Sequence, residues 1–345
     1  MLEKIKRIPV AVRLLLRTGI ICAAVVIAVN PVSCRLTEEG IVVIDDNYAC
    51  PKLESYSVTG EKSARLVFDK KVTLKEYSLR PEIPVISVNM ESGAEDVLCF
   101  ADIIFENALE TGKEYVLYGE VRDKAGNSLT FSLPLIGFNP MIPQLEITEV
   151  HPRYASGSNA SGKYFKCEYV ELRILSPGNL SGLELFSAYD GDSKKYVFPP
   201  VNVKSGEIII VHLRKKEESA VSELGENLNL SDTKYSSDSA RDLWAENENA
   251  RLGDEQDVIL VLNSFNGSVL DAVCYAQEGT ESWNNPSMEN AALKASEEGK
   301  WTGNSVTDAV LVPSITASKS LEKIAADNLP ASWSLSGVSP GVVSF

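Results

Sequence analysis

Short stretches in which apolar and polar residues alternate strictly are the feature that most limits the folds open to this chain. From Val170 to Ile174 every second residue is apolar, the pattern of a β-strand with one face against a core. A similar stretch at 145–150 stops before Pro152, and a Gly/Ser-rich loop joins the two. The second stretch ends in the Ser-Pro-Gly-Asn turn cluster at 176–179. The pattern predicts paired β-strands.

Candidate strands of this kind recur along the whole chain. In the N-terminal half they lie at residues 64–69, 83–89, 97–100, 103–105, 114–121 and 128–134. Short strands separated by turn signals predict an all-β sandwich. The 345 residues are enough for two ordinary domains with their own cores. We therefore expect an all-β fold built of two tandem sandwiches.

The N-terminus has the order of a secretion signal. Five basic residues precede an apolar run at 19–29, which is shorter than the about 20 residues that span a bilayer but suits a signal-peptide core. The run ends in Asn-Pro-Val-Ser-Cys34, which resembles a bacterial lipobox. This resemblance implies a signal peptide over 1–33, lipidation at Cys34 and a tether over 34–49. The alternatives are an ordinary cleaved signal and an uncleaved anchor, and each places residues 35–345 outside the cytoplasm.

The charge of the chain bears on its partners. The formal net charge is −15, and the first 33 residues hold five Lys/Arg and one Glu. The remainder therefore has 28 basic and 47 acidic residues, a net charge of −19. Such a chain is repelled by phosphate backbones and anionic headgroups unless a local basic patch intervenes. We expect no nucleic-acid partner, and we expect an envelope or extracellular protein or glycan, with attachment to the membrane through the lipid anchor alone.

Two motifs at 111–129 suggest what the first sandwich is. Thr-Gly-Lys-Glu-Tyr at 111–115, followed by Val-Arg-Asp-Lys-Ala-Gly-Asn-Ser-Leu at 121–129, resembles the end of a bacterial extracellular immunoglobulin-like domain. The alternative is that residues 123–127 simply form a good β-turn, and both can hold. The resemblance implies an immunoglobulin-like spacer over 50–138 and a linker over 139–144.

The second half carries a more specific set of motifs. They are Glu-Val-His-Pro at 149–152, Glu-Tyr-Val-Glu-Leu at 168–172, Leu-Gly-Asp-Glu-Gln at 252–256, Val-Leu-Asp-Ala-Val-Cys-Tyr at 269–275 and Ser-Pro-Gly at 339–341. Together they resemble a lamin tail domain, a small immunoglobulin-like β-sandwich, over residues 145–343. Asn266-Gly267 predicts a type I′ hairpin, and Asn285-Pro286 predicts the start of a helix running to residue 298. The polar stretch 214–250 is expected to be an insertion that contributes little core.

No catalytic or metal site is expected. The two histidines, His151 and His212, lie in or beside candidate strands and are expected to be packed residues, and no strained nucleophile turn is expected beside them. Glu168 and Glu171 are three positions apart on a strand, so they point to opposite faces and cannot flank one bond. Asp-Gly-Asp at 190–192 lacks the partners of a calcium loop and is expected to be a turn. No cofactor is implied.

The cysteines allow two disulfides. Six are present, and with Cys22 in the signal and Cys34 acylated, two remain in each expected domain. The pairings would be Cys50–Cys99 and Cys167–Cys274, in a compartment that permits disulfides. The alternative is that Cys274, inside a strand, is a buried free thiol.

The resemblances imply a non-catalytic cell-envelope lipoprotein that acts as a binding or structural module. Binding is expected in loops at the ends of the sandwich and in the 214–250 segment. One alternative is a secreted, unanchored adhesin-like protein. The other, from a different class, is an extracytoplasmic hydrolase with an unfamiliar site. The sequence leaves open the ligand, the choice of inner or outer membrane, and the oligomeric state.

Overall fold

The computed structural model describes residues 49–93, 98–160 and 162–345. The expected signal peptide, the lipidation site Cys34 and all but the last residue of the tether lie outside the described residues. Within them the chain is built almost entirely of β-strands, with one α-helix, α2 (Pro286–Glu297). The expected all-β fold is therefore confirmed. The described residues include no helix that is both long and apolar enough to cross a membrane.

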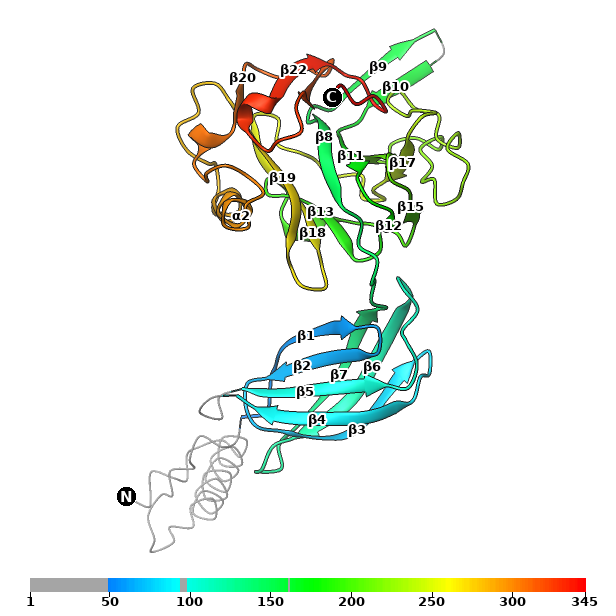
Figure 1. Cartoon of the computed structure of the whole chain (residues 1–345), viewed down its shortest axis with the longest axis vertical. Helices are drawn as coiled ribbons and strands as arrows, with labels where there is room; N and C mark the ends of the chain where they lie inside the picture. The colour runs from blue at the N-terminus through cyan, green and yellow to red at the C-terminus, as the bar shows by residue number, and fades with distance from the viewer. Residues whose placement is uncertain (1–48, 94–97, 161) are drawn as a thin grey trace, which may run out of the picture. The chain divides into compact units, whose positions relative to one another are not determined.

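Strands before residue 137 form the N-terminal β-region (Figure 1). Four antiparallel strands make one sheet, in the order β1 (Leu53–Gly60), β2 (Ser63–Phe68), β5 (Cys99–Phe105), β4 (Val85–Ser92). Three more make a second sheet, in the order β3 (Thr73–Arg80), β6 (Glu114–Arg122), β7 (Ser128–Ile136). Alternate side chains from both sheets bury a single core that includes Leu66, Phe68, Ile103, Leu117 and Leu133. The expected segments 97–100 and 103–105 belong to one strand, β5.

A five-residue turn at 123–127 joins β6 to β7. The Asp123 carboxylate accepts a hydrogen bond from the Asn127 backbone N–H at 2.9 Å, and Gly126 has a φ of +91°. An Asp that bonds the backbone farther along and a Gly that tolerates positive φ are the usual requirements of such a turn. The Asp-Lys-Ala-Gly-Asn motif is thus accounted for by local turn chemistry.

Strands from residue 145 onward form the C-terminal β-region, which holds two larger sheets (Figure 1). The six-stranded sheet has the order β17 (Arg241–Trp244), β16 (Ile208–His212), β11 (Tyr169–Ile174), β8 (Leu145–His151), β21 (Lys319–Lys323), β22 (Trp333–Gly337). The five-stranded sheet has the order β14 (Tyr196–Val197), β13 (Leu183–Ser187), β18 (Gln256–Asn263), β19 (Val269–Gln277), β20 (Val310–Val312). Residues from both sheets form the main core, among them Ile147, Leu172, Val211, Leu260 and Val273. The short strands β12 (Gly178–Asn179) and β15 (Asn202–Val203) pair separately.

Helix α2 packs against the five-stranded sheet through Met288, Ala291, Ala292 and Ala295. The Asn285 side chain accepts a hydrogen bond from the Met288 backbone N–H at 2.9 Å, so this residue caps the helix as the sequence predicts. The β18–β19 turn differs from the expected two-residue type. Ser268 pairs with Asn263 and leaves a four-residue loop, because the Ser264 N–H remains bonded to Gly182 O at 2.8 Å and extends the β13–β18 pairing.

The 214–250 segment corrects the expectation of a polar insertion with little core. Its strand β17 pairs in parallel with β16, and its residues Ala220, Tyr235 and Trp244 are buried. They cover the face of the six-stranded sheet that points away from the main core. Strands β11 and β16 are therefore buried on both faces.

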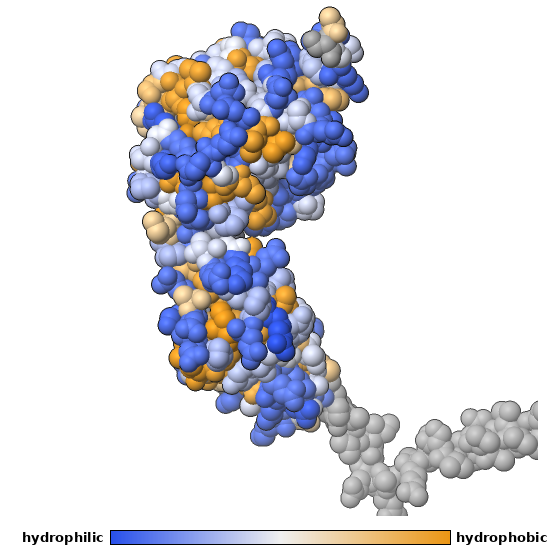
Figure 2. Space-filling view, turned by 90° about the vertical axis from the view of Figure 1, so that its right-hand side faces the viewer, coloured by the Kyte–Doolittle hydropathy of each residue, from blue (hydrophilic) through white to orange (hydrophobic). Residues whose placement is uncertain are grey.

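A two-stranded hairpin, β9 (Ala155–Asn159) and β10 (Gly162–Lys166), leaves the C-terminal β-region between β8 and β11 and projects from it (Figure 1). Tyr164 lies opposite Gly157 in the pairing, and its ring occupies the space that a Cβ on Gly157 would need. The missing Cβ thus lets the ring lie flat across the hairpin. Over the face drawn in Figure 2, hydrophilic residues alternate with separate hydrophobic areas.

Candidate functional site

A layer of buried polar residues separates the six-stranded sheet from the 214–250 segment. We call it the polar layer and define it as Glu149, His151, Tyr169, Glu171, His212, Tyr235 and Asp242, all less than 9% exposed. The layer follows from strand alternation, because Tyr169 and Glu171 point away from the core that Val170 and Leu172 enter. Buried polar groups need partners, so the contacts inside this layer decide what it does.

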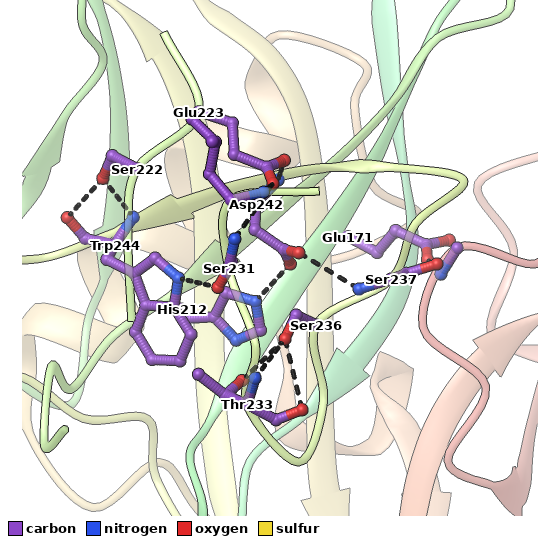
Figure 3. A network of polar contacts seen from close by, with 12 residues as sticks. Glu171, His212, Ser222, Glu223, Ser231, Thr233, Ser236, Ser237, Asp242 and Trp244 are labelled. Carbon is purple, nitrogen blue, oxygen red and sulfur yellow. Dashed lines mark hydrogen bonds and ion pairs between the residues drawn. The ribbon is translucent and has the colours of Figure 1, made fainter. Parts of the chain in front are cut away.

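The pair His212–Asp242 fastens the 214–250 segment to the sheet (Figure 3). His212 Nε2 and Asp242 Oδ1 are 2.6 Å apart, and the imidazole stacks on Trp244 with ring centroids 4.0 Å apart and planes at 9°. The second Asp242 oxygen accepts the Ser237 N–H, and the Asp242 N–H donates to Glu223 Oε2. Since β17 runs beside β16, Asp242 faces Ile210 and lies diagonal to His212.

The same pair does not have the geometry of a hydrolase. Both side chains are at most 1% exposed, and His212 Nδ1 has no hydrogen-bond partner among the described residues. A general base must reach both its nucleophile and the substrate, and a serine nucleophile would lie within about 3.2 Å of a ring nitrogen. Among the described residues the one hydrogen bond of the His212 ring is to the Asp242 carboxylate, so the pair connects strand β16 to strand β17.

His151 is also built into the layer. Its ring stacks on Tyr169 with centroids 5.4 Å apart and meets the edge of Tyr235 at 4.9 Å. Burial lowers its pKa to about 4, so the ring is neutral at physiological pH, and Nδ1 lies 3.2 Å from the Cys167 carbonyl oxygen. Tyr235 donates its hydroxyl to Ala317 O at 2.9 Å. The contacts of His151 and Tyr169 with Tyr235 hold the 214–250 segment against the sheet.

The two candidate carboxylates, Glu168 and Glu171, have separate partners. Glu168 pairs with Arg214 at 2.5 Å, and burial raises its pKa to about 7. Glu171 accepts hydrogen bonds from Thr148 Oγ1 at 2.7 Å and from the Gly341 N–H at 2.6 Å, and burial raises its pKa to about 8. The two carboxylates therefore contact different parts of the chain. Glu149 likewise accepts the Ser339 N–H at 3.0 Å, so both ends of the Ser-Pro-Gly motif are bonded to the layer.

The proposed disulfides are absent from the structure: Cys50, Cys99, Cys167 and Cys274 are all free thiols. For Cys167 and Cys274 the reason is their placement. Cys274 lies in the main core, whereas Cys167 packs on the other side of the six-stranded sheet with Ala220 and Trp244. Cys99 is buried in the core of the N-terminal β-region, whereas Cys50 is exposed. Of the alternatives open at the sequence level, a buried free thiol describes Cys274.

Metal ligands do not gather anywhere in the described part of the chain. Gly191 of the Asp-Gly-Asp motif has a φ of +78°, and Asp190 pairs with Lys194 at 2.9 Å. The motif is therefore part of the connection between β13 and β14, as the turn interpretation predicts.

An open cleft lies between the β9–β10 hairpin and the 214–250 segment. We call it the hairpin cleft; it has a volume of about 680 Å³ and is lined by Ser158, Asn159, Lys163, Tyr164, Lys166, Glu217, Asp232, Thr233 and Lys234. Both walls belong to loops and a hairpin that project from a buried sheet. Pockets that bind small molecules typically have volumes of about 300–1,000 Å³, and the hairpin cleft falls in this range.

Hydrogen bonds and close packing support the walls of the hairpin cleft. Thr233 and Ser236 bond each other through backbone and side-chain atoms at 2.6–3.2 Å, and Tyr235 next to them is buried. Asp232 donates its N–H to Ser219 O at 3.0 Å. Lys234 is thus presented by a fixed turn, while Tyr164 is fixed on the opposite wall by Gly157.

The sequence analysis missed both Asp242 and the cleft. Asp242 is 30 positions from His212, and its one local signal is a polar residue between Arg241 and Leu243 in a short run ending at Trp244. The cleft joins residues 158–166 to 217–234, two stretches that the sequence shows only as a Gly/Ser-rich loop and a polar segment. The cleft lies in the loops and the 214–250 segment where binding was expected, and binding there stays a prediction.

Comparison with known proteins gives a family match, a related protein and two solved structures of low similarity. A Treponema pallidum (strain Nichols) protein described as an uncharacterized protein is 29% identical over 230 residues, which cover 64% of this chain and 56% of that protein. The chain thus spans little more than half the length of this relative.

Two solved structures share low similarity with the chain. One is the N-terminal part of the bacterial S-layer protein SbsC, with 17% identity over 36% of this chain and 41% of that one, at a TM-score of 0.23. The other is a DUF4876 family protein from Bacteroides thetaiotaomicron VPI-5482, with 14% identity over 65% and 77%, at a TM-score of 0.23. Neither supports an inference about function. The model of the TP_1001_2nd family, described as a protein second domain, matches residues 143–335, more than half of the chain, and the chain therefore belongs to this family.

Proposed function

We propose that the chain is a lipid-anchored extracytoplasmic protein whose lamin-tail-like C-terminal β-region binds a partner and catalyses no reaction. The observation that carries the proposal is the hairpin cleft, a pocket of about 680 Å³ with polar side chains on two anchored walls. Rigid scaffolds present binding groups on the loops that leave them. The N-terminal β-region would then act as a spacer.

The polar layer supports binding over catalysis. His151 and His212 are both fully buried, and the carboxylates of Glu149 and Glu171 are occupied by backbone N–H groups of residues 339–341. These contacts use the most reactive side chains of the region to hold loops in place. The residues that line the hairpin cleft include no histidine or cysteine that would serve as base or nucleophile.

Membrane attachment is a separate part of the proposal and has its own test. Cells fed a labelled fatty acid should incorporate label into the wild-type chain, and Cys34→Ser should lose both the label and membrane retention. Cys22→Ser is the matched control and should keep both. Release of the unlabelled wild-type protein into the medium would instead support the secreted adhesin-like alternative.

The binding role is tested by blocking the cleft. The full chain, purified in a zwitterionic detergent, is applied to an array of oligosaccharides and peptides, and Ser158→Trp, which fills the cleft from its rim, should lose the signal. Ser282→Trp places the same side chain at an exposed position away from the cleft and should keep it. If the chain instead hydrolyses ester or glycoside substrates, and His212→Ala abolishes hydrolysis while the fold is retained, the proposal is wrong.

A further inference from the structure

We propose that the hairpin cleft binds an acidic saccharide, meaning a sugar that carries one carboxylate or sulfate group beside its hydroxyls. The inference rests on the proposed binding function and names the class of ligand. It comes from the unusual mixture of side chains in the cleft: three lysines, two carboxylates, three uncharged polar residues and one tyrosine.

The lysines indicate that the ligand is negatively charged. The chain has a net charge of −15, and most of its described basic side chains pair with carboxylates. Lys163, Lys166 and Lys234 form no ion pair with any described residue, although Glu217 and Asp232 line the same cleft. Lys163 Nζ lies 4.9 Å from the centre of the Phe165 ring, which leaves Lys166 and Lys234 as the two ammonium groups available to an anion.

The carboxylates indicate that the ligand also carries hydroxyl groups. Glu217 and Asp232 line the same cleft, and burial raises the pKa of Glu217, an effect to which the charge of Asp232 adds. Two neighbouring carboxylates disfavour a polyanion such as a nucleic acid, but they accept hydrogen bonds from hydroxyls. Ser158 and Thr233 add hydroxyls that both donate and accept. A ligand with one acidic group and several hydroxyls fits this set of donors and acceptors.

Tyr164 adds a flat apolar surface. Its ring lines the cleft and is fixed over Gly157, so it loses little conformational freedom when a ligand binds. An aromatic ring with a polar tip suits a ligand that has both an apolar C–H face and hydroxyls, as a pyranose has.

The size and lining of the cleft favour a short saccharide over a peptide. Grooves that bind extended peptides combine a free strand edge with apolar pockets for alternate side chains. Strand β10 does offer an edge, but the lining has one aromatic residue and no aliphatic one. An acidic peptide is therefore the competing occupant that the experiment has to distinguish.

The test uses three pairs of probes. Each pair compares an acidic saccharide with its neutral counterpart: sialyllactose with lactose, sulfated lactose with lactose, and tetragalacturonate with its carboxyl-reduced form. Calorimetry on the full chain in a zwitterionic detergent should show binding of at least one acidic probe, with the neutral partner at least about tenfold weaker, which is the usual effect of one charge-assisted hydrogen bond. The sialyllactose and sulfated lactose arms distinguish a carboxylate from a sulfate.

Variants connect the binding to the cleft. The double change Lys166→Gln and Lys234→Gln should lower the affinity for the acidic probe about 100-fold, since each lysine supplies one charged contact. The affinity for the neutral counterpart should stay unchanged. The control, Lys75→Gln with Lys124→Gln, removes the same charge from exposed positions of the N-terminal β-region and should change nothing. Tyr164→Ala should weaken acidic and neutral probes alike.

The outcomes separate this inference from the proposed function. If acidic and neutral probes bind equally well and Ser158→Trp abolishes both, the proposal of an acidic ligand is wrong and the proposed binding function stands. Binding of an oligoglutamate peptide but of no saccharide, lost in the double lysine variant, would overturn the saccharide and keep the binding function. Binding to none of the saccharide probes would overturn the inference, and the array with Ser158→Trp decides the function independently.

Discussion

Replacing Glu171 by Gln should change how the stability of the C-terminal β-region depends on pH. In the folded chain burial raises the pKa of Glu171 to about 8, whereas in an unfolded chain a glutamate titrates at about 4.3. Between these values the folded state keeps a proton that the unfolded state has released. The stability that this proton contributes is fully present below the lower value and is lost as the pH rises through the upper one.

The size of the effect follows from linkage. One proton contributes a slope of about 1.4 kcal/mol per pH unit between the two pKa values, so wild type should lose about 2.5 kcal/mol through this group between about pH 6 and about pH 9. Glutamine fits the site, because its oxygen can accept the Gly341 N–H while its NH₂ group donates to Thr148 Oγ1. Glu171→Gln should therefore keep the contacts and lose this part of the pH dependence.

Urea unfolding followed by tryptophan fluorescence measures the effect. All four tryptophans lie between residues 244 and 333, so the signal reports the C-terminal β-region alone. The free energy of unfolding of Glu171→Gln minus that of wild type should rise by about 2.5 kcal/mol from about pH 6 to about pH 9. For the exposed control Glu281→Gln, the difference in free energy of unfolding from wild type should stay constant over this pH range. If the stability of Glu171→Gln follows the wild-type pH profile, the claim that Glu171 keeps its proton in the folded state is wrong.

Three further predictions follow from the same structure. A thiol-reactive maleimide should label Cys50 in the folded protein and label Cys99, Cys167 and Cys274 only after denaturation; non-reducing peptide mapping that finds a linked pair would contradict this. Asp242→Ala should lower the free energy of unfolding by about 2–4 kcal/mol, since it removes the acceptor of a buried histidine, whereas Asp238→Ala at an exposed site should cost less than about 0.5 kcal/mol. Replacing residues 215–240 by a short Gly/Ser linker should expose Tyr169 and Ile210, seen as binding of a hydrophobic dye; a cooperative fold that binds no dye would show that the segment is dispensable.

Strand alternation and capping chemistry were sufficient for a large part of the fold. The period-2 pattern at 170–174 correctly assigns Val170, Leu172 and Ile174 to the core, and the Asn285 cap fixes the start of α2. Both features depend on neighbours within a few positions, which is why the sequence contains them.

The polar layer could not be predicted from the sequence, because the residues that contact each other in it are far apart in the chain. Tyr235 packs against Tyr169 and His151 and donates a hydrogen bond to Ala317 O, and these three partners come from distant parts of the chain. The short run Arg241–Trp244 has no strand alternation of its own and becomes a strand by pairing in parallel with β16. The polar composition of 214–250 predicts an exposed segment. The prediction fails here because the neighbouring sheet supplies hydrogen-bond partners for the buried polar groups.

The position of β21 has a consequence for the order in which the protein can fold. This strand pairs with β8, and Leu321 lies opposite Val150, 171 positions earlier. Until residues 319–323 are available, β8 has a free edge next to the main core, so a partly synthesised chain cannot complete its six-stranded sheet. Pairing over such a separation makes folding slow and leaves an aggregation-prone edge in the meantime. A chain of this design would benefit from staying unfolded, bound to a holding chaperone, until its last strands have emerged.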